Sequence, residues 1–503
     1  MRHIISGNKS LRFVAYLIVL LNFFILTGFS SMGQPNDKKM NVLFIISDDL
    51  TTTAISSYEN EACHTPHIDK LASEGMRYTR TYCQFPVCGP SRASFMFGYY
   101  PSATETYGYT SGRENVGDER KSWSQLFKDN GYFTARVSKI YHMGSVDIMN
   151  GLNGQDDEVS WHERYNSAAP EVHAKGEGEL VQKNPYGLRP VLREKNSNGG
   201  NLMNIVKMDE GQEHTDCKTA EKAVELIRQH KNEPFFLAVG FFRPHVPFVA
   251  PKEYFEPYPY QQIVLPPKVE NDWDDIPERG INYVTSVNGQ MTEEQEKKAV
   301  AAYYACVSYM DVQVGKVLEA LKDEGLEDNT IVIFTSDHGF HLGEHRFWMK
   351  VGLHEESARV PMIIKVPGKK PGVCHSLAEM VDMYPTVAEL AGLKVSGHLQ
   401  GKSLVKTLDN PEHTVRDAAF SMHRRNGEFS YLLRTEKWAY LQYDEDAGSG
   451  MELFDMEHDP KQYNNLADNP EYTDIVEMLQ EKLKSKLEEV RNNDLNKNYS
   501  AVL

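Results

Sequence analysis

A cysteine beside a predicted helix start is the first feature of this sequence that can do chemistry. Cys88 is followed by a Gly-Pro pair and then by Ser91 and Arg92, ahead of an apolar run. Proline suits a first helical turn and serine is a good N-terminal cap, so we expect a helix to begin here with Ser91 as its cap. The helix N-terminus and Arg92 both favour an anion at this point. The segment is therefore either a reactive thiol at an anion site or a buried structural cysteine.

Acidic residues follow two further stretches of strand-forming residues. Asp48 and Asp49 come directly after one apolar run, and Asp337 and His338 come after another. Because the carboxyl ends of parallel strands meet at one edge of a sheet, we expect these side chains to lie close together. Three carboxylates repel one another without a cation, and Ca²⁺ suits them when few waters complete its shell. The alternatives are a solvated acidic turn at Asp48 and Asp49 and a substrate-facing role for His338.

Basic residues and histidines stand in the loops after other predicted strands. Lys139 and His142 have the spacing Lys-x-x-His, and His245 lies in a loop with prolines on either side. Proline restricts its own backbone and that of the preceding residue, which holds the direction of His245. Lys350 follows a Gly-Glu-His segment. Taken alone, Lys139 and His142 are more typical of a surface loop than of a functional site.

The apolar runs that precede these residues predict the core. Continuous β-branched and aromatic runs are typical of central strands covered on both faces. Strands are expected at 41–47, 132–137, 234–240, 330–335 and 360–368. Helices are expected at 65–75, 123–130, 219–230, 292–321 and 383–390. The pattern predicts an α/β fold with a mixed, mainly parallel central sheet flanked by helices.

The chain is expected to have three parts. Residues 1–33 carry basic residues, an apolar run and small residues, which is typical of a cleaved secretory signal; an uncleaved anchor is the alternative. Residues 34–400 form the expected catalytic domain, with a polar excursion at 144–216. Residues 401–503 form a smaller C-terminal α+β subdomain. Its elements are short antiparallel strands at 431–434, 438–441 and 452–455 and a helix at 474–491.

Composition excludes some classes of function. The 503 residues are 40% hydrophobic and 25% charged, which is typical of a globular protein. A net charge of −17 argues against non-specific nucleic-acid binding but leaves room for a locally basic site. The six cysteines show no zinc spacing, and their pairing cannot be deduced from the sequence.

In combination these residues resemble the type I, formylglycine-dependent sulfatases of the alkaline-phosphatase superfamily. The segment that begins at Cys88 is similar to their Cys-x-Pro-Ser-Arg signature and is followed by the usual Gly98. The acidic, basic and histidine residues above occur in the family's order. The segments 235–248 and 336–345 look most like iduronate-2-sulfatase and bacterial polysaccharide sulfatases.

The resemblance implies an alkaline-phosphatase-like fold and hydrolysis of sulfate esters. Cys88 would be oxidised to formylglycine by a separate maturation enzyme; one hydroxyl of its hydrate attacks sulfur, and the other expels sulfate by re-forming the aldehyde. Arg92 would hold and activate this nucleophile. Lys139 and Lys350 would bind sulfate oxygens, while His245 protonates the leaving oxygen and His142 accepts a proton. The implied Ca²⁺ ligands are Asp48, Asp49, Cys88, Asp337 and His338.

The implied substrate is a sulfated oligosaccharide or polysaccharide that contains uronate, such as ulvan or a glycosaminoglycan. An exported protein, periplasmic or secreted and without a stable membrane span after signal cleavage, fits this substrate. Basic residues of the polar excursion either contact uronate carboxylates or are solvated loop charges; they are His162, Arg164, Arg189 and Arg193. The alternatives are a phosphodiesterase or phosphatase of the same superfamily, and a carbohydrate-binding protein without activity if Cys88 is not converted.

Overall fold

The computed structural model describes residues 39–58, 60–168, 174–181, 203–395 and 397–495. The predicted signal at 1–33 lies outside these residues, as do Arg189 and Arg193. From Met40 onward the chain forms one unit by its internal contacts, and the predicted boundary at 400/401 stays a prediction. Within the described ranges, no helix has the length and apolar character needed to cross a bilayer.

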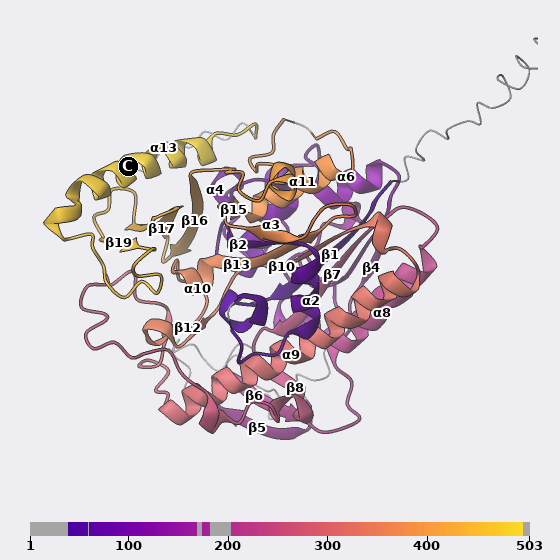
Figure 1. The fold of residues 1–503 in the computed structure, drawn as a ribbon, viewed down its shortest axis with the longest axis horizontal. Coiled ribbons are helices and arrows are strands. Elements are labelled where there is room, and N and C mark those ends of the chain that lie inside the picture. The colour runs from indigo at the N-terminus through magenta and orange to yellow at the C-terminus, as the bar shows by residue number, and fades with distance from the viewer. Residues whose placement is uncertain (1–38, 59, 169–173, 182–202, 396, 496–503) are drawn as a thin grey trace, which may run out of the picture. The chain divides into compact units, whose positions relative to one another are not determined.

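A nine-stranded sheet is the centre of the fold (Figure 1). Its strands are β1 (Asn41–Asp48), β2 (Met76–Tyr82), β3 (Phe133–Ser138), β4 (Glu163–Tyr165), β7 (Phe235–Pro244), β10 (Thr330–Ser336), β13 (Arg359–Lys365), β14 (Gly372–Cys374) and β15 (Ala378–Glu379). The order is β14-β2-β13-β10-β1-β7-β3-β4, with β15 beside β2. Only β13 runs antiparallel to its neighbours, β10 and β2. The predicted mixed, mainly parallel sheet is therefore confirmed.

The central strands are buried on both faces because their apolar residues serve two cores. In β1, Leu43 and Ile45 join the core that also contains residues of α2 (Pro66–Glu74), α8 (Thr215–Gln229) and α9 (Glu293–Asp323). Val42 and Phe44 of the same strand join the opposite core, with α3 (Cys88–Phe97), α6 (Trp123–Asp129) and α11 (Met383–Leu390). This alternation explains why the sequence shows a continuous apolar run at 41–47. Figure 1 shows α8 and α9 side by side.

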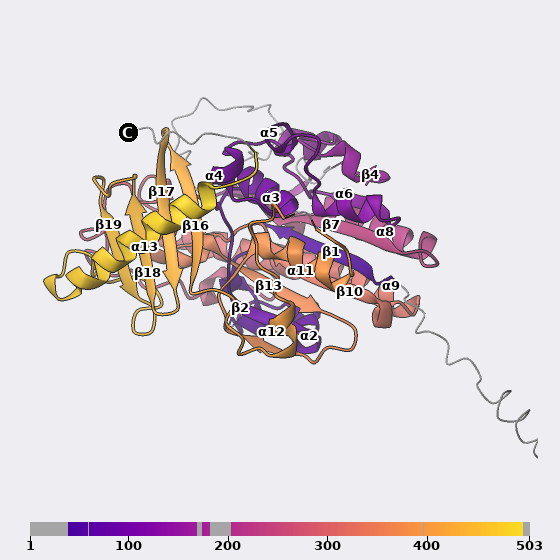
Figure 2. The ribbon, with the colours of Figure 1, turned by 90° about the horizontal axis from the view of Figure 1, so that it is seen from above.

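A separate four-stranded antiparallel sheet forms the smaller C-terminal subdomain. Its strands lie in the order β16 (Ala418–Arg425), β17 (Glu428–Thr435), β18 (Trp438–Tyr443) and β19 (Met451–Asp455). The terminal helix α13 (Thr473–Arg491) lies across these strands in Figure 2. Val476, Leu479, Leu483 and Leu487 of α13 share one core with the sheet, at the three- and four-residue spacing of one helix face.

The described parts of the polar excursion at 144–216 are built into the main fold, as expected. Its strand β4 pairs with β3 in the central sheet. Two further strands form a three-stranded sheet with the strand after the His245 loop; they are β5 (Gly176–Leu180), β6 (Asn204–Met208) and β8 (Phe248–Pro251). A third small sheet contains β9 (Val284–Thr285), β11 (His341–Leu342) and β12 (Phe347–Met349). The short helices are α4 (Pro101–Thr104), α5 (Arg113–Val116), α7 (Ser145–Asn150), α10 (Glu355–Ala358) and α12 (Val405–Asp409).

Candidate active site

The carboxyl ends of β1 and β10 bring the predicted acidic residues together. These strands are parallel neighbours, and Ser47 pairs with Ser336, so the residues after them emerge side by side. The backbone N–H of Asp49 donates to Asp337 Oδ1 at 3.1 Å. Asp49 has a left-handed backbone with φ 64°, which turns the chain at the sheet edge. Asp48, Asp49, Asp337 and His338 are all fully buried.

Cys88 is the first residue of α3. It faces Asp48, Asp49, Asp337 and His338, which together we call the acidic edge. Its side chain is buried, with 2% of the residue exposed. The sulfur lies 3.1 Å from Lys350 Nζ and 3.2 Å from His338 Nε2. The predicted capping role of Ser91 is wrong, because the helix begins at Cys88 and Ser91 lies inside its first turn. There the Ser91 hydroxyl donates to the Asp337 carbonyl at 2.5 Å, which ties the helix to β10.

Arg92 joins the two acidic strand ends. Its Nη2 donates to Asp48 Oδ1 at 3.1 Å and its Nε donates to Asp337 Oδ2 at 2.9 Å. Its Nη1 donates to the backbone carbonyl of Lys139 at 2.5 Å and to that of Ile140 at 3.0 Å. All these groups are buried, so Arg92 fixes the positions of three chain segments around Cys88.

Two lysines place positive charge on the acidic edge. Lys139 Nζ lies 2.5 Å from Asp48 Oδ2, and Lys350 Nζ lies 2.6 Å from Asp49 Oδ1. Lys350 lies between Met349 and Val351, which both have left-handed backbones with φ 64° and 85°. A β-branched residue such as valine rarely adopts this conformation, so the surrounding structure holds the Lys350 segment in place.

The two predicted histidines lie on either side of this cluster. His142 is near the Cys88 sulfur, and its ring stacks on Tyr109 with centroids 4.2 Å apart. Burial lowers the pKa of His142 although Cys88 opposes the shift, which favours the neutral imidazole. His245 Nε2 lies 4.0 Å from Asp49 Oδ2. β7 runs to Pro244, beyond the predicted end at residue 240, and so reaches His245 directly.

The charges around Cys88 favour an anion at its sulfur. Burial alone raises a thiol pKa, but Lys350, Lys139 and His338 outweigh burial and hold the pKa of Cys88 well below its usual range. Burial and Cys88 also raise the pKa of Asp48, yet Lys139, His245 and Arg92 keep it well below its usual range. Cys88 and Asp48 are therefore ionised beside several cations.

The donor set at the sheet edge fits a hard cation. Ligand atoms of Asp48, Asp49, Cys88 and His245 lie close enough to share one ion, and so do those of Cys88, Asp337 and His338. Asp49 Oδ2 is buried and has no hydrogen-bond partner, so it is an acceptor that a cation would satisfy. Carboxylate oxygens are the ligands that Ca²⁺ prefers.

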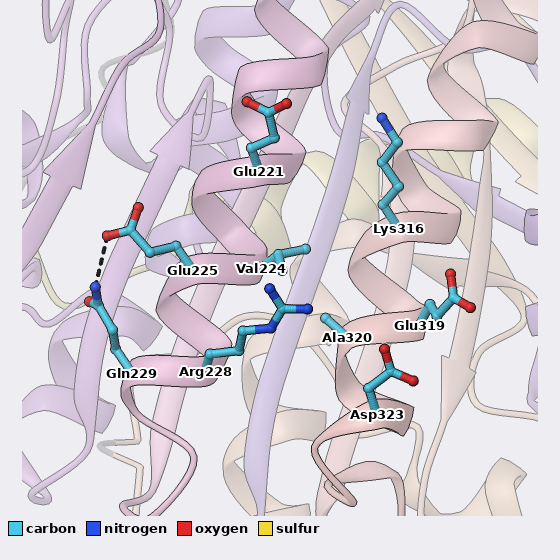
Figure 3. Close-up of a pocket in the computed structure, with 9 residues that line it drawn as sticks. All are labelled: Glu221, Val224, Glu225, Arg228, Gln229, Lys316, Glu319, Ala320 and Asp323. Carbon is cyan, nitrogen blue, oxygen red and sulfur yellow. Dashed lines mark hydrogen bonds between the residues drawn. The ribbon is translucent and has the colours of Figure 1, made fainter.

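Other residues noted in the sequence lie outside the cluster of charged residues and histidines around Cys88. Arg164 pairs with Glu158 at 2.6 Å, and His162 Nδ1 accepts the backbone N–H of Thr134 at 3.1 Å. All six cysteines are free thiols. A groove between α8 and α9 shares no residue with the cluster (Figure 3). It lies along the later part of both helices, whereas Asp216 at the start of α8 bonds to the carboxyl end of β7.

Sequence reasoning missed several residues that shape the site. Tyr109 is 57% exposed and covers His142, and Tyr303 accepts the Thr51 N–H at 2.9 Å and donates to the Asp49 carbonyl at 2.5 Å. Asp216 and Arg243 support the loop that carries His245. Tyr109 lies in an aromatic cluster and Arg243 lies two residues before His245, which are the available sequence signals, whereas Tyr303 and Asp216 act from distant elements.

Known proteins resemble this chain over most of its length. Residues 40–393 match the family described as Sulfatase, and residues 343–490 match the family described as N-sulphoglucosamine sulphohydrolase, C-terminal. A sulfatase of Formosa agariphila is 30% identical over 483 residues, covering 91% of this chain and 90% of its own. Iduronate 2-sulfatase of Mus musculus is 32% identical over 427 residues, covering 76% of this chain and 74% of its own. A structure solved with its substrate D-glucosamine-2-N,6-O-disulfate shares the fold, with a TM-score of 0.67 at 22% identity over 92% of this chain and 100% of that one.

Proposed function

Because this chain belongs to the sulfatase family and is a sulfuric ester hydrolase, we propose that it removes sulfate from a sulfated carbohydrate with residue 88 as the nucleophile. The position of the Cys88 sulfur carries the proposal. It lies at a helix N-terminus, 3.1 Å from Lys350 Nζ and 3.2 Å from His338 Nε2. Positive groups preorganised around one atom favour the sulfate group and the negative charge that develops on it.

In this proposal Cys88 is converted to formylglycine by a separate maturation enzyme. The hydrated aldehyde supplies one hydroxyl to attack sulfur and a second to release sulfate, a route that an unmodified cysteine lacks. Lys139 and Lys350 bind the sulfate oxygens, and Arg92 holds residue 88 against the acidic edge. Neutral His142 accepts the proton of the releasing hydroxyl, and His245 donates a proton to the leaving oxygen of the sugar.

The proposed metal is Ca²⁺, held by Asp48, Asp49, Asp337, His338 and residue 88. The buried carboxylates and the unpartnered Asp49 Oδ2 support this choice, since oxygen donors suit a hard cation. When bound, the ion supplies positive charge that polarises a sulfate oxygen and favours an ionised nucleophile. Arg92 and Lys139 keep the carboxylate of Asp48 ionised and oriented for this role.

The proposed substrate contains a sulfated uronate. Similarity to iduronate 2-sulfatase supports a uronate, and the family match at 343–490 supports a glycosaminoglycan-type saccharide. Ulvan, an algal polysaccharide, offers the same chemistry. The predicted signal at 1–33 supports export to the periplasm or the medium, where such polymers are met.

Sulfate release from defined saccharides tests the reaction and the sugar together. The panel contains 2-O-sulfated uronate disaccharides from heparin, sulfated ulvan oligosaccharides and matched phosphate esters. Wild type should release sulfate, Cys88→Ala should release none while remaining folded, and Cys217→Ala, a thiol outside the cluster, should match wild type. Turnover of phosphate esters alone would support a phosphatase, and saccharide binding without release would support a binding protein.

Mass spectrometry of the peptide that contains residue 88 tests the conversion. Oxidation of the thiol to the aldehyde lowers the peptide mass by about 18 Da. Active protein with an unmodified thiol would contradict the formylglycine proposal.

A further inference from the structure

We infer that Arg243 is a positioning residue that holds the imidazole of His245 in its working orientation. The inference rests on the proposed role of His245 as proton donor to the leaving oxygen. Arg243 is the penultimate residue of β7 and lies two residues before His245, and its side chain is fully buried. A buried guanidinium is costly unless its donors are used, so its partners indicate what it does.

The guanidinium of Arg243 folds back onto the loop that carries His245. Its Nη1 donates to the His245 carbonyl at 2.8 Å and to the Pro247 carbonyl at 2.7 Å. These two carbonyls lie on either side of Val246. The guanidinium is planar and its donors have fixed directions, so one group fixes the backbone of the whole turn.

The carbonyl of Val246 is what sets the imidazole. His245 Nδ1 lies 2.6 Å from this carbonyl oxygen, which can only accept a hydrogen bond, so Nδ1 carries the hydrogen. Nε2 is then the ring atom that faces the acidic edge, 4.0 Å from Asp49 Oδ2. Arg243 binds the residues on either side of Val246 and so holds the Val246 carbonyl against Nδ1 of His245. That hydrogen bond fixes which ring nitrogen carries the hydrogen and orients Nε2 toward the acidic edge.

The backbone at Arg243 is itself anchored to two elements. The carboxylate of Asp216, in the first turn of α8, accepts the N–H of Phe242 at 2.8 Å and that of Arg243 at 3.0 Å. The Ser47 hydroxyl donates to the Arg243 carbonyl at 2.8 Å. Ser47 directly precedes Asp48, so this bond sets the His245 loop in register with the acidic edge.

The ring of Phe242 completes the support. It stacks on the His245 imidazole with centroids 4.9 Å apart and an interplanar angle of 26°. The Arg243 guanidinium carbon lies 4.8 Å from the centre of the same ring. Arg243 therefore supports the imidazole both through the backbone turn and through an aromatic contact, and the guanidinium acts through His245 rather than on the substrate.

The way in which kcat depends on the leaving group of the ester distinguishes this positioning role of Arg243 from general support of the fold. A proton donor matters most when the leaving oxygen is basic, so its displacement slows sugar sulfates more than sulfates of acidic phenols. The substrates are 4-nitrophenyl sulfate, phenyl sulfate and a 2-O-sulfated heparin disaccharide. Arg243→Met should lower kcat on the disaccharide by about 10²-fold, and on 4-nitrophenyl sulfate by less than about tenfold.

A double-mutant cycle tests whether Arg243 acts through His245. If it does, Arg243→Met added to His245→Ala should cause no further loss of kcat on the disaccharide. Arg243→Lys, which keeps a positively charged donor but loses the planar guanidinium, should lie between wild type and Arg243→Met. Arg434→Met, which removes a buried arginine of the C-terminal subdomain that pairs with Glu355 of α10, should leave the leaving-group dependence unchanged.

Two outcomes would overturn the inference. One is an equal loss of kcat on all three esters, and the other is a full additional loss in the His245→Ala background. If thermal unfolding shows that Arg243→Met does not fold, Arg243→Lys replaces it in both measurements, and the same two outcomes would overturn the inference. A wild-type enzyme that hydrolyses none of the sulfate esters would instead contradict the proposed function.

Discussion

The ammonium nitrogen of Lys350 lies 3.1 Å from the Cys88 sulfur and 2.6 Å from Asp49 Oδ1, so one cation contacts both the proposed nucleophile and the acidic edge. Lys350→Met should lower kcat on 4-nitrophenyl sulfate by about 10²–10³-fold, because a preorganised donor to the developing charge is lost. Lys268→Met, which removes an ion pair with Glu296 outside the site, should leave kcat unchanged. An unaltered kcat in Lys350→Met would contradict the role of this lysine.

Calcium removal should destabilise the protein as well as inactivate it. A ligand that binds only the folded state at about 100 times its Kd adds about 2.7 kcal/mol to the free energy of unfolding. The chelator EGTA should therefore lower the thermal unfolding midpoint, and added Ca²⁺ should restore it. Asp337→Asn should lose this calcium-dependent shift.

A second acidic group provides the control for the calcium experiment. Among the described residues, Asp455, Glu457 and His458 also lie close enough to share an ion, but Glu457 and His458 are exposed. Asp455→Asn should keep the full calcium-dependent shift. If Asp455→Asn loses it and Asp337→Asn keeps it, the ion binds at the C-terminal subdomain and not at the acidic edge.

Arg92 should contribute strongly to stability through its two buried ion pairs. Arg92→Met removes the side chain that forms ion pairs with both Asp48 and Asp337 and leaves both carboxylates buried. Breaking a buried pair in this way costs about 3–5 kcal/mol. Urea unfolding measures the loss. Arg80→Met, whose partner Glu436 is 81% exposed, should cost about 0–1 kcal/mol; equal losses in both variants would contradict the expectation.

His423 in β16 should make the protein less stable in mild acid. Burial, together with Arg279 and Arg425, lowers the pKa of His423 to about 3, whereas a histidine in the unfolded chain titrates near 6.5. The unfolded state therefore takes up a proton first as pH falls. The stability that neutral His423 provides is complete above about pH 6.5 and is lost toward pH 3, at about 1.4 kcal/mol per pH unit.

A non-titrating replacement isolates this effect. Between about pH 7 and about pH 5, wild type should lose about 2 kcal/mol more free energy of unfolding than His423→Gln. Urea unfolding at both pH values measures the difference. Parallel losses in the two proteins would mean that His423 is protonated in the fold or reaches solvent.

The central strands and the long helices could be predicted from sequence because burial decides their composition. β1, β7 and β10 are buried on both faces and therefore appear as continuous apolar runs. β2 was missed, because its sequence Met-Arg-Tyr-Thr-Arg-Thr-Tyr alternates with polar residues that are half exposed. β16 was missed as well, since its register with β17 comes from long-range pairing that a local pattern does not show.

The meeting of the acidic residues at one edge of the sheet could be predicted from a rule of topology. The residues that hold this edge and the His245 loop in place could not be predicted. Parallel strands end at one edge, which explains why Asp48 and Asp337 meet. The expected cap at Ser91 failed because that hydroxyl donates to the carbonyl of Asp337, directly after β10, instead of capping its own helix. Asp216 gave no signal, because it acts from α8 on the backbone of β7, and only the tertiary fold brings the two together.

The burial of Cys88 also sets an order of events during synthesis. With 2% of the residue exposed, its thiol is out of reach of another protein's catalytic groups once the fold is complete. The residues that enclose it, His338 and Lys350, are 250 and 262 positions later in the chain. If residue 88 is converted as proposed, the maturation enzyme would have to act while that later stretch is still unfolded or not yet made, and the speed of folding would limit how many molecules become active.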